Sequence, residues 1–215
     1  LLFWLFKEPP FAKKPLSIKL HHAINIFISA FKHPKIKVMS LYFLIMLLGW
    51  SGYYTFIGEY ARQTYHLSPF EVSMFMGALG LGFALGAGII INIFNKYLQL
   101  KTTVSTGLIL ASVFMLAYLI IPAQTQILAW INTIIIGIFG IMAWSNLMVL
   151  FSNQVDEHEQ GWVMGVTGSI MALAFAIISF FMGSLINHFG INFPIINGAI
   201  CMFVAGVLFL FSKFK

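Results

Sequence analysis

The sequence predicts an all-α membrane protein with six transmembrane helices. The chain is 60% hydrophobic and 8% charged, with a mean hydropathy of +0.93, whereas soluble domains carry about 25% charged residues. From Val38 onward, six apolar stretches alternate with short polar breaks, and each stretch is close to the ~20 residues that cross a bilayer. If the stretches cross in turn, eleven of the 12 Lys and Arg residues lie on one side and only Arg62 lies on the other. Because basic loops stay on the cytoplasmic face, both ends of the chain are predicted to be cytoplasmic.

The segment before the six stretches is basic. Residues 1–6 are apolar but too short to span, so we interpret them as the end of a preceding helix and expect the chain to be a fragment. Residues 7–37 carry seven lysines and form a cytoplasmic connector. Within it, apolar residues recur at helical spacing, which predicts an amphipathic helix on the membrane surface: Leu20, Ile24, Phe27 and Phe31. Docking on a partner protein is the alternative for this helix.

The remaining residues, 38–215, are predicted to form the transmembrane bundle. The first span covers about 38–58 and is followed by an outer segment over 59–69 that contains Arg62. The second span begins at Ser68-Pro69-Phe70-Glu71, in which Ser68 and Glu71 form a capping box and Pro69 occupies the first helical position. It runs to about Phe94, before a basic turn over 95–101.

The last four spans follow the same alternation. The third covers about 102–121 and stops at Pro122, and the fourth covers about 127–150 after an uncharged outer turn. An acidic break over 153–160 precedes the fifth span, at about 161–186. The sixth span, at about 194–211, follows a second outer turn and ends before the final lysines.

Glycines suggest where these helices pack closely. Gly82 and Gly86 in the second span form a small-xxx-small pair, which lets another helix approach. Gly161 and Gly165 repeat this spacing at the start of the fifth span. We therefore predict that these four glycines lie at helix contacts.

The layout resembles the C-terminal half of a major facilitator superfamily transporter, and the resemblance covers essentially the whole chain. That family often places a Gly-x-x-x-Asp-Arg-x-Gly-Arg-Arg turn after the second span of each half. Here the turn reads Asn-Ile-Phe-Asn-Lys-Tyr-Leu-Gln-Leu-Lys over 92–101, with Asn95 and Lys96 where Asp-Arg stands and Leu98 in place of a glycine. Residues 159–165, Glu-Gln-Gly-Trp-Val-Met-Gly, resemble the start of the fifth span in drug-efflux members, although the proline that follows in those members is missing.

The resemblance implies a function as well as a fold. It implies secondary active transport of a small organic solute by alternating access, as proton-coupled efflux in the drug:proton antiporter branch. The partner of this bundle is then the N-terminal six-helix half of the same transporter, in a bacterial cytoplasmic (inner) membrane. The first, second, fourth and fifth spans line the central cavity in this family, and Asn95 with Lys96 become gating candidates.

Polar and aromatic residues within the spans are the candidate cavity residues, because such groups face the interior of a bundle and suit an amphipathic or aromatic small molecule. The candidates are Tyr53, Tyr54, Asn132, Trp144 and Asn146. For each of them, a hydrogen bond between helices or anchoring at the membrane interface is the alternative.

Glu59 and Arg62 are three residues apart at the outer end of the first span, which allows them to pair across one helical turn. The pair is either an interfacial salt bridge or a gating or coupling element. No acidic residue lies in the middle of a span, so we expect a coupling carboxylate in the other half.

Other classes of function find little support. The chain has no nucleophile elbow, no phosphate-binding loop and no His-x-x-x-His pair, so we predict no enzyme activity and no cofactor. Residues 156–159, Asp-Glu-His-Glu, are interpreted as a solvated loop rather than a metal site. The basic residues set topology rather than bind nucleic acid. The alternative to a transporter is a non-transporting membrane scaffold or a degenerate half-transporter, which six further spans upstream would exclude.

Overall fold

The computed structural model describes residues 28, 31–33 and 36–212, and within them every regular element is a helix. The elements are α3 (Lys37–Tyr65), α4 (Pro69–Leu85), the π-helix η1 (Gly86–Ile90), α5 (Ile91–Tyr97), α6 (Leu100–Ala117), α7 (Gln126–Asn153), the 3-10 helix η2 (Glu157–Glu159), α8 (Gln160–Phe189) and α9 (Phe193–Phe211). Most of the amphipathic helix expected near residues 20–31 lies outside the described residues.

Six helical segments are long and apolar enough to cross a membrane, which confirms the predicted fold class. They are α3, the continuous stretch from α4 through η1 to α5, α6, α7, η2 with α8, and α9. Their order and approximate limits follow the six apolar stretches of the sequence. The protein is therefore an all-α, multi-pass membrane protein.

The first helix extends further than the sequence analysis predicts. Residues 59–65 were expected in an outer segment, but α3 continues to Tyr65. Tyr60, Ala61 and Tyr65 are buried along one face of this extension, so packing continues beyond the apolar run. The helix ends at His66, which adopts a left-handed conformation with φ of 55°.

The start of α4 confirms the predicted capping box. The Oγ of Ser68 accepts a hydrogen bond from the backbone N–H of Glu71 at 3.4 Å, and Glu71 Oε2 accepts from the N–H of Ser68 at 2.8 Å. Pro69 takes the first position of the helix, where a missing N–H costs nothing. The second span thus starts where its local sequence indicates.

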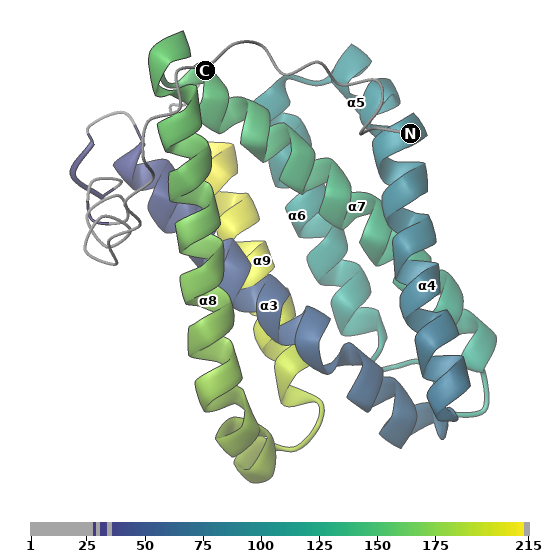
Figure 1. Cartoon of the computed structure of the whole chain (residues 1–215). Coiled ribbons are helices and arrows are strands. Elements are labelled where there is room, and N and C mark those ends of the chain that lie inside the picture. Colours follow the sequence, from purple (N-terminus) through teal and green to yellow (C-terminus); the bar gives the residue numbers. More distant parts are fainter. Residues whose placement is uncertain (1–27, 29–30, 34–35, 213–215) are drawn as a thin grey trace, which may run out of the picture.

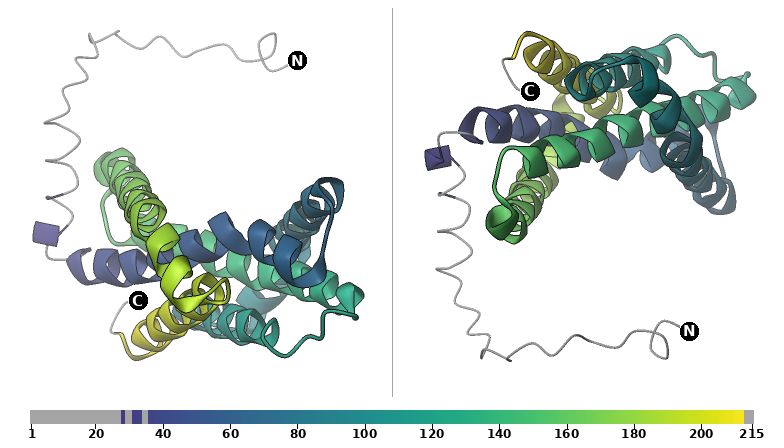
Figure 2. Two further views of the ribbon diagram at one scale, coloured as in Figure 1. Left: turned by 90° about the horizontal axis from the view of Figure 1, so that it is seen from below. Right: turned by 90° about the horizontal axis from the view of Figure 1, so that it is seen from above.

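The six spanning segments form three layers of two (Figures 1 and 2). Helices α3 and α7 make the middle layer, with α6 and α9 on one side of it and α4 and α8 on the other. Helix α4 packs on α7, and α8 packs on α3. The two outer helices α4 and α8 therefore flank an open face whose floor is α3 and α7.

Two ends of the bundle can be distinguished by charge. The end that carries Lys37, Lys96 and Lys101 is called the basic end here, and the opposite end, where α3 finishes, is called the Arg62 end. At the basic end, Lys101 Nζ donates to the Ser212 carbonyl at 2.8 Å and joins α6 to the end of α9. A charged side chain thus connects α6 with the end of α9 at the basic end.

Close packing of α4 on α7 depends on glycine. A Cβ at Gly82 would collide with the carbonyl oxygen of Ile134 and lie 3.0 Å from the Cα of Gly137. A Cβ at Gly86, one turn later, would lie 2.7 Å from the carbonyl oxygen of Ile138. Both obstacles are backbone atoms that cannot move aside, so the predicted Gly82 and Gly86 pair lies directly against α7.

The other predicted glycine pair has a different environment. No atom lies within 4 Å of a Cβ built at Gly161 or Gly165. Both residues are exposed on α8. Glycine at these positions is therefore not explained by packing within this bundle.

The π-helix η1 interrupts the second span and changes its register against α7. Both helices run toward the basic end, and the span advances nine residues from Gly86 to Asn95 while α7 advances eight from Ile138 to Asn146. The Nδ2 of Asn95 donates to Oδ1 of Asn146 at 2.8 Å. A π-helix takes up one extra residue in an α-helix, so η1 allows Asn95 to reach Asn146.

This register can be tested by changing the length of the span. Deletion of Ala87 should convert η1 into regular α-helix and keep Asn95 opposite Asn146, whereas insertion of one alanine after Ile91 should turn Asn95 away by about 100°. A double-mutant cycle between Asn95→Ala and Asn146→Ala should give a coupling of about 0.5–1.5 kcal/mol in the native and deleted chains and none in the extended chain. Unfolding can be followed by the reaction of Cys201, the one cysteine of the sequence, with a thiol dye. Loss of coupling in the deletion variant would contradict this register.

Candidate functional site

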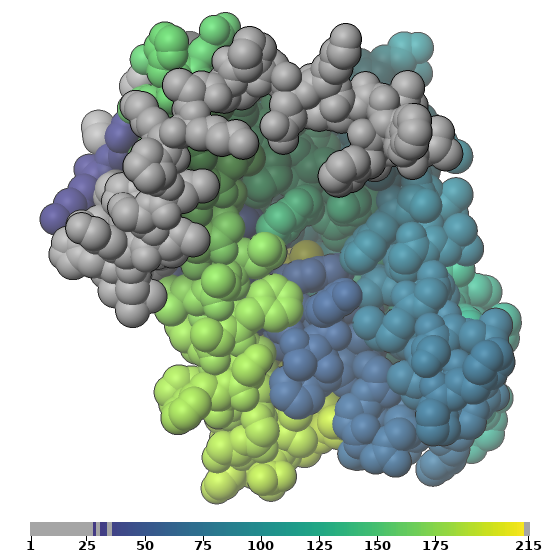
Figure 3. Space-filling model, in the orientation of Figure 1, coloured from purple at the N-terminus to yellow at the C-terminus, as the bar shows by residue number. Residues whose placement is uncertain are grey.

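A pocket of about 250 Å³ opens on the face between α4 and α8, in the hollow visible in Figure 3. Helix α3 supplies four of its lining residues, α7 supplies three, α8 two, and α4 and α9 one each. The lining residues are Met46, Leu47, Trp50, Tyr54, Phe83, Gly140, Ile141, Trp144, Met171, Phe175 and Met202. Helix α6 contributes none of these residues, and the first, second, fourth and fifth spans supply all of them except Met202 of α9.

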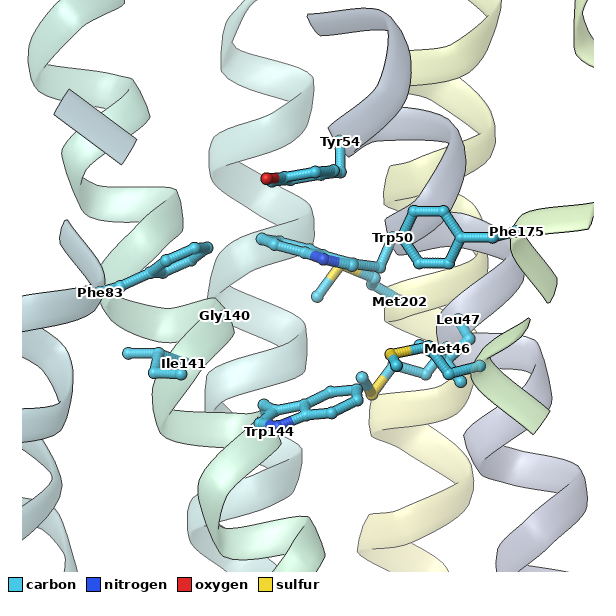
Figure 4. A pocket seen from close by; sticks show the side chains of 11 residues that line it. Met46, Leu47, Trp50, Tyr54, Phe83, Gly140, Ile141, Trp144, Phe175 and Met202 are labelled. Atoms are coloured by element: carbon cyan, nitrogen blue, oxygen red, sulfur yellow. The ribbon is translucent and has the colours of Figure 1, made fainter. Parts of the chain in front are cut away.

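Five of the eleven lining residues are aromatic (Figure 4). The ring of Trp50 stacks on Tyr54 with centroids 6.3 Å apart and an angle of 25°, and its centroid lies 6.0 Å from that of Phe83. Trp144 lies on the opposite side of the space from Trp50. The pocket is therefore a slot bounded by indole rings on two sides.

Glycine gives Trp50 its position. A Cβ at Gly140 would lie 3.0 Å from both Cη2 and Cζ3 of the Trp50 ring, which is closer than such contacts normally come. The absence of a side chain at Gly140 lets the six-membered ring of Trp50 lie close to α7. Gly140 thus determines both how closely α3 and α7 approach at the pocket and where the Trp50 ring lies.

The pocket is apolar and carries no charged side chain. Its polar side-chain groups are the hydroxyl of Tyr54 and the indole N–H groups of Trp50 and Trp144. Three methionines, Met46, Met171 and Met202, complete the lining. Thioether side chains are flexible and polarizable and make favourable contacts with rings, so the wall can adapt to aromatic molecules of differing outline.

The structure divides the five predicted cavity residues into two groups. Tyr54 and Trp144 line the pocket. Tyr53 does not line the pocket, because neighbouring residues on a helix point about 100° apart. The Tyr53 ring is instead fully buried, and its hydroxyl lies 3.5 Å from that of Tyr118. Asn132 donates from Nδ2 to the Phe114 carbonyl at 2.9 Å and joins α7 to α6.

Asn146 also lies away from the pocket lining. It is buried, accepts from Asn95 and donates from Nδ2 to the carbonyl of Met142 at 2.9 Å. Asn95 and Asn146 were predicted in different roles, and the structure brings them together. Lys96 is exposed beside them, with its Nζ 5.6 Å from the centroid of the Tyr97 ring.

Glu59 and Arg62 form the pair that their spacing predicts. Arg62 donates from Nη2 to Glu59 Oε1 at 2.6 Å and from Nε to Oε2 at 2.8 Å, and Gln63 donates to Oε1 at 2.6 Å. The pair lies on the surface at the Arg62 end, with side-chain exposures of 55% for Arg62 and 39% for Glu59. It does not line the pocket. Exposed pairs of this kind contribute about 0–1 kcal/mol to stability.

Sequence reasoning missed most of the lining residues. Met46, Trp50 and Tyr54 follow one another at intervals of four, which places them on one face of α3. Met171 and Phe175 repeat this interval on α8. Bulky apolar residues at this spacing were a usable signal, whereas the predicted cavity residues were polar or aromatic ones.

Within the described part of the chain, no three His, Cys, Asp or Glu side chains come together as metal ligands. The acidic residues 156–159 lie instead around η2, at the start of the fifth span.

Comparison with known proteins places the chain in a family. A search of curated proteins found none whose sequence matches it. Comparison with the sequence models of protein families matches residues 1–178 to the Major Facilitator Superfamily. This match covers most of the chain and agrees with six spanning helices and a pocket on their open face. The chain belongs to the major facilitator superfamily.

Proposed function

We propose that this chain forms one six-helix half of a secondary transporter that moves a small organic solute by alternating access. The observation that carries the proposal is the uncharged pocket on the open face between α4 and α8. A pocket with one open side is half of an enclosed site. In transporters built from two bundles, the solute lies near the middle of the membrane where the bundles meet.

The exposed faces of α4 and α8 favour contact with a second bundle, the N-terminal half of the transporter. These two spans are the least buried of the six, at 28% and 22% compared with 44–50% for the others. Small exposed residues follow one face of each: Ser73, Gly77, Gly80, Ala84 and Gly88 on the second span, and Gly161, Gly165, Gly168, Ala172 and Ala176 on α8. Small side chains let helices approach closely within the membrane, whereas contact with lipid requires no such selection.

The orientation and the coupling are also part of the proposal. Basic residues favour a cytoplasmic position, so the basic end faces the cytoplasm of a bacterial cell. Transport is efflux coupled to proton entry, in the drug:proton antiporter branch. Because no acidic residue lines the pocket, the titrating carboxylate belongs to the other bundle. Asn95, Lys96, Glu59 and Arg62 act at the two ends as gating residues.

Alternating access can be tested without knowing the solute. In a Cys201→Ser background, Met171→Cys places a thiol in the pocket wall, and a membrane-impermeant maleimide should label it from either side of sealed vesicles. Ile120→Cys at the Arg62 end and Tyr97→Cys at the basic end are exposed controls, at 82% and 74%, and each should react from one side. Labelling of Met171→Cys from a single side would reject alternating access and favour a scaffold.

The proposed second bundle can be tested at Gly165. Gly165→Leu should leave thermal unfolding of this bundle unchanged, since no neighbouring atom lies within 4 Å of a Cβ built at Gly165. It should, however, prevent the second bundle from approaching α8 closely near the basic end. Met171→Cys would then be labelled from the basic side alone, while Gly165→Ala should retain labelling from both sides. Labelling of the Gly165→Leu variant from both sides would show that α8 does not meet a second bundle here.

Proton coupling predicts that flux follows a pH gradient. Proteoliposomes can be loaded with trimethyl(2-naphthyl)ammonium or naphthalene-2-sulfonate, whose permanent charges prevent passive distribution by pH. Export of a transported probe should accelerate when the receiving side is acidic, because proton entry then drives it. Protein-dependent flux at the same rate with and without the pH gradient would reject proton coupling but would still support transport.

A further inference from the structure

We propose that the second span exchanges between two registers on α7, with either Asn95 or Phe94 opposite Asn146, and that Ile141 in the pocket wall determines which register is populated. Ile141 is thus a positioning residue, because it acts on the basic end through the second span. The exchange of registers goes beyond the proposed function, whereas its effect on access to the pocket rests on that function.

The first step concerns the hydrogen bonds of η1. The Gly86 carbonyl accepts from the backbone N–H of Ile91, five residues later, where a regular helix uses the residue four later. The positions that follow one another toward α7 are therefore Gly86, Ile91 and Asn95. If η1 were regular α-helix, the same line would run from Gly86 through Ile90 to Phe94. The two registers thus differ by one residue beyond Gly86.

The second step is that the sequence accommodates both registers. Residues 89–91 are all isoleucine, so Ile90 in place of Ile91 presents the same side chain to α7. Phe94 is half-buried in the present register, and its ring centroid lies 6.4 Å from that of Phe139 on α7. The registers therefore differ in chemistry mainly where Phe94 replaces Asn95 opposite Asn146.

The third step compares the energies of the two registers. The exchange loses the hydrogen bond from Asn95 to Asn146, whose net contribution is modest. Asn146 keeps its bond to the Met142 carbonyl, which lies on its own helix. No residue of α5 is buried, so a turn of α5 disrupts little packing. In return η1 becomes regular α-helix, which is far commoner than π-helix. Opposing terms of similar size leave both registers accessible.

The fourth step identifies what holds η1 in its present form. The Cγ2 methyl of Ile141 occupies the place that a Cβ of Gly86 would take, and the Ile138 carbonyl oxygen lies 2.7 Å from that place. Helix α7 thus encloses the residue whose carbonyl accepts the π-type bond. Ile141 also lines the pocket beside Phe83 (Figure 4). A molecule that moves Ile141 away from Gly86 therefore frees this carbonyl to accept from Ile90 instead.

The consequence appears at the basic end. Conversion of η1 turns α5 by about 100° relative to α4 and separates Asn95 from Asn146, which join the second and fourth spans there. Both spans line the pocket, so loss of this contact opens the pocket toward the basic end. The position of one side chain in the pocket wall is thereby converted into a change at the end of the bundle.

Distances between spin labels report the register in the full chain, in lipid nanodiscs and a Cys201→Ser background. One label is attached at Tyr97→Cys on α5, which is 74% exposed. The second is attached at Val38→Cys or Glu157→Cys, both exposed on other elements of the basic end. A turn of about 100° moves a side chain that lies about 5 Å from the helix axis by about 8 Å. At least one of the two distances should therefore change by about 4 Å or more.

Two substitutions at one position test the role of Ile141. Ile141→Ala removes the Cγ2 methyl beside Gly86 and should raise the population at the second distance, relative to the first, by about fivefold or more. Ile141→Val retains this methyl and should keep the native distance. Deletion of Ala87 leaves no extra residue to release, so Ile141→Ala should cause no shift in that background. No second distance in Ile141→Ala, an equal shift in Ile141→Val, or a shift that persists without Ala87 would overturn the proposal.

Access to the pocket is measured separately, by maleimide labelling of Met171→Cys in sealed vesicles. Labelling from the basic side should be about threefold or more faster with Ile141→Ala than with Ile141→Val, and this difference should vanish when Ala87 is deleted. Equal rates despite a shift in register would overturn the effect on access.

The outcomes separate this inference from the proposed function. Labelling of Met171→Cys from a single side in the native chain would reject alternating access, yet the spin-label distances would still decide whether the registers exchange. Labelling from both sides together with unchanged distances in Ile141→Ala would support transport and reject the register exchange.

Discussion

Every backbone polar group within the spanning part of this protein must find its partner inside the protein, because the bilayer offers no water. The backbone meets this requirement by forming helices. Many side chains meet it by two further routes, whereas the buried Oγ atoms of Ser40 and Ser51 in α3 have no hydrogen-bond partner within the described part of the chain. Thr103 and Ser105 in α6 donate to carbonyls one turn back on their own helix. Tyr118, by contrast, joins different helices, since its hydroxyl lies beside those of Tyr53 and Thr133. Thr103, Ser105 and Tyr118 do not line the pocket, which is bounded by uncharged side chains.

The same constraint explains why the glycines of this chain fall into two kinds. Without a hydrophobic force between helices in lipid, association depends on close packing, and Gly82, Gly86 and Gly137 let α4 and α7 approach until backbone atoms touch. Gly161 and Gly165 have open space around them. Two glycine pairs with the same spacing in the sequence thus have different environments: Gly82 and Gly86 pack against α7, whereas Gly161 and Gly165 are exposed.

Much of the fold could be predicted from the sequence, because it depends on patterns that act locally. Apolar length determined the six spans, and Ser68, Pro69 and Glu71 marked the start of α4 within one residue. The pocket could not be predicted to the same degree. Tyr53 and Tyr54 are neighbours with similar side chains, yet one is buried between helices and the other lines the pocket. The difference is a matter of helix rotation, which is set by all the neighbouring helices together. The π-helix η1 was equally inaccessible, because its five residues, Gly-Ala-Gly-Ile-Ile, are also compatible with regular α-helix.

The position of η1 links the pocket to the basic end through one helix. Ile141 lines the pocket, and its side chain also lies against Gly86, the first residue of η1. Further along α7, Asn146 holds Asn95 on the other side of η1. Displacement of Ile141 by a bound solute would therefore act on the segment of the second span that is not regular α-helix. The extra residue in η1 is not needed to bring Asn95 and Asn146 together, because a regular helix shorter by one residue would do the same. A π-helix at a position where a regular helix would serve is a feature often found at functional sites, and along the second span it lies between Phe83 in the pocket wall and Asn95 at the contact with Asn146.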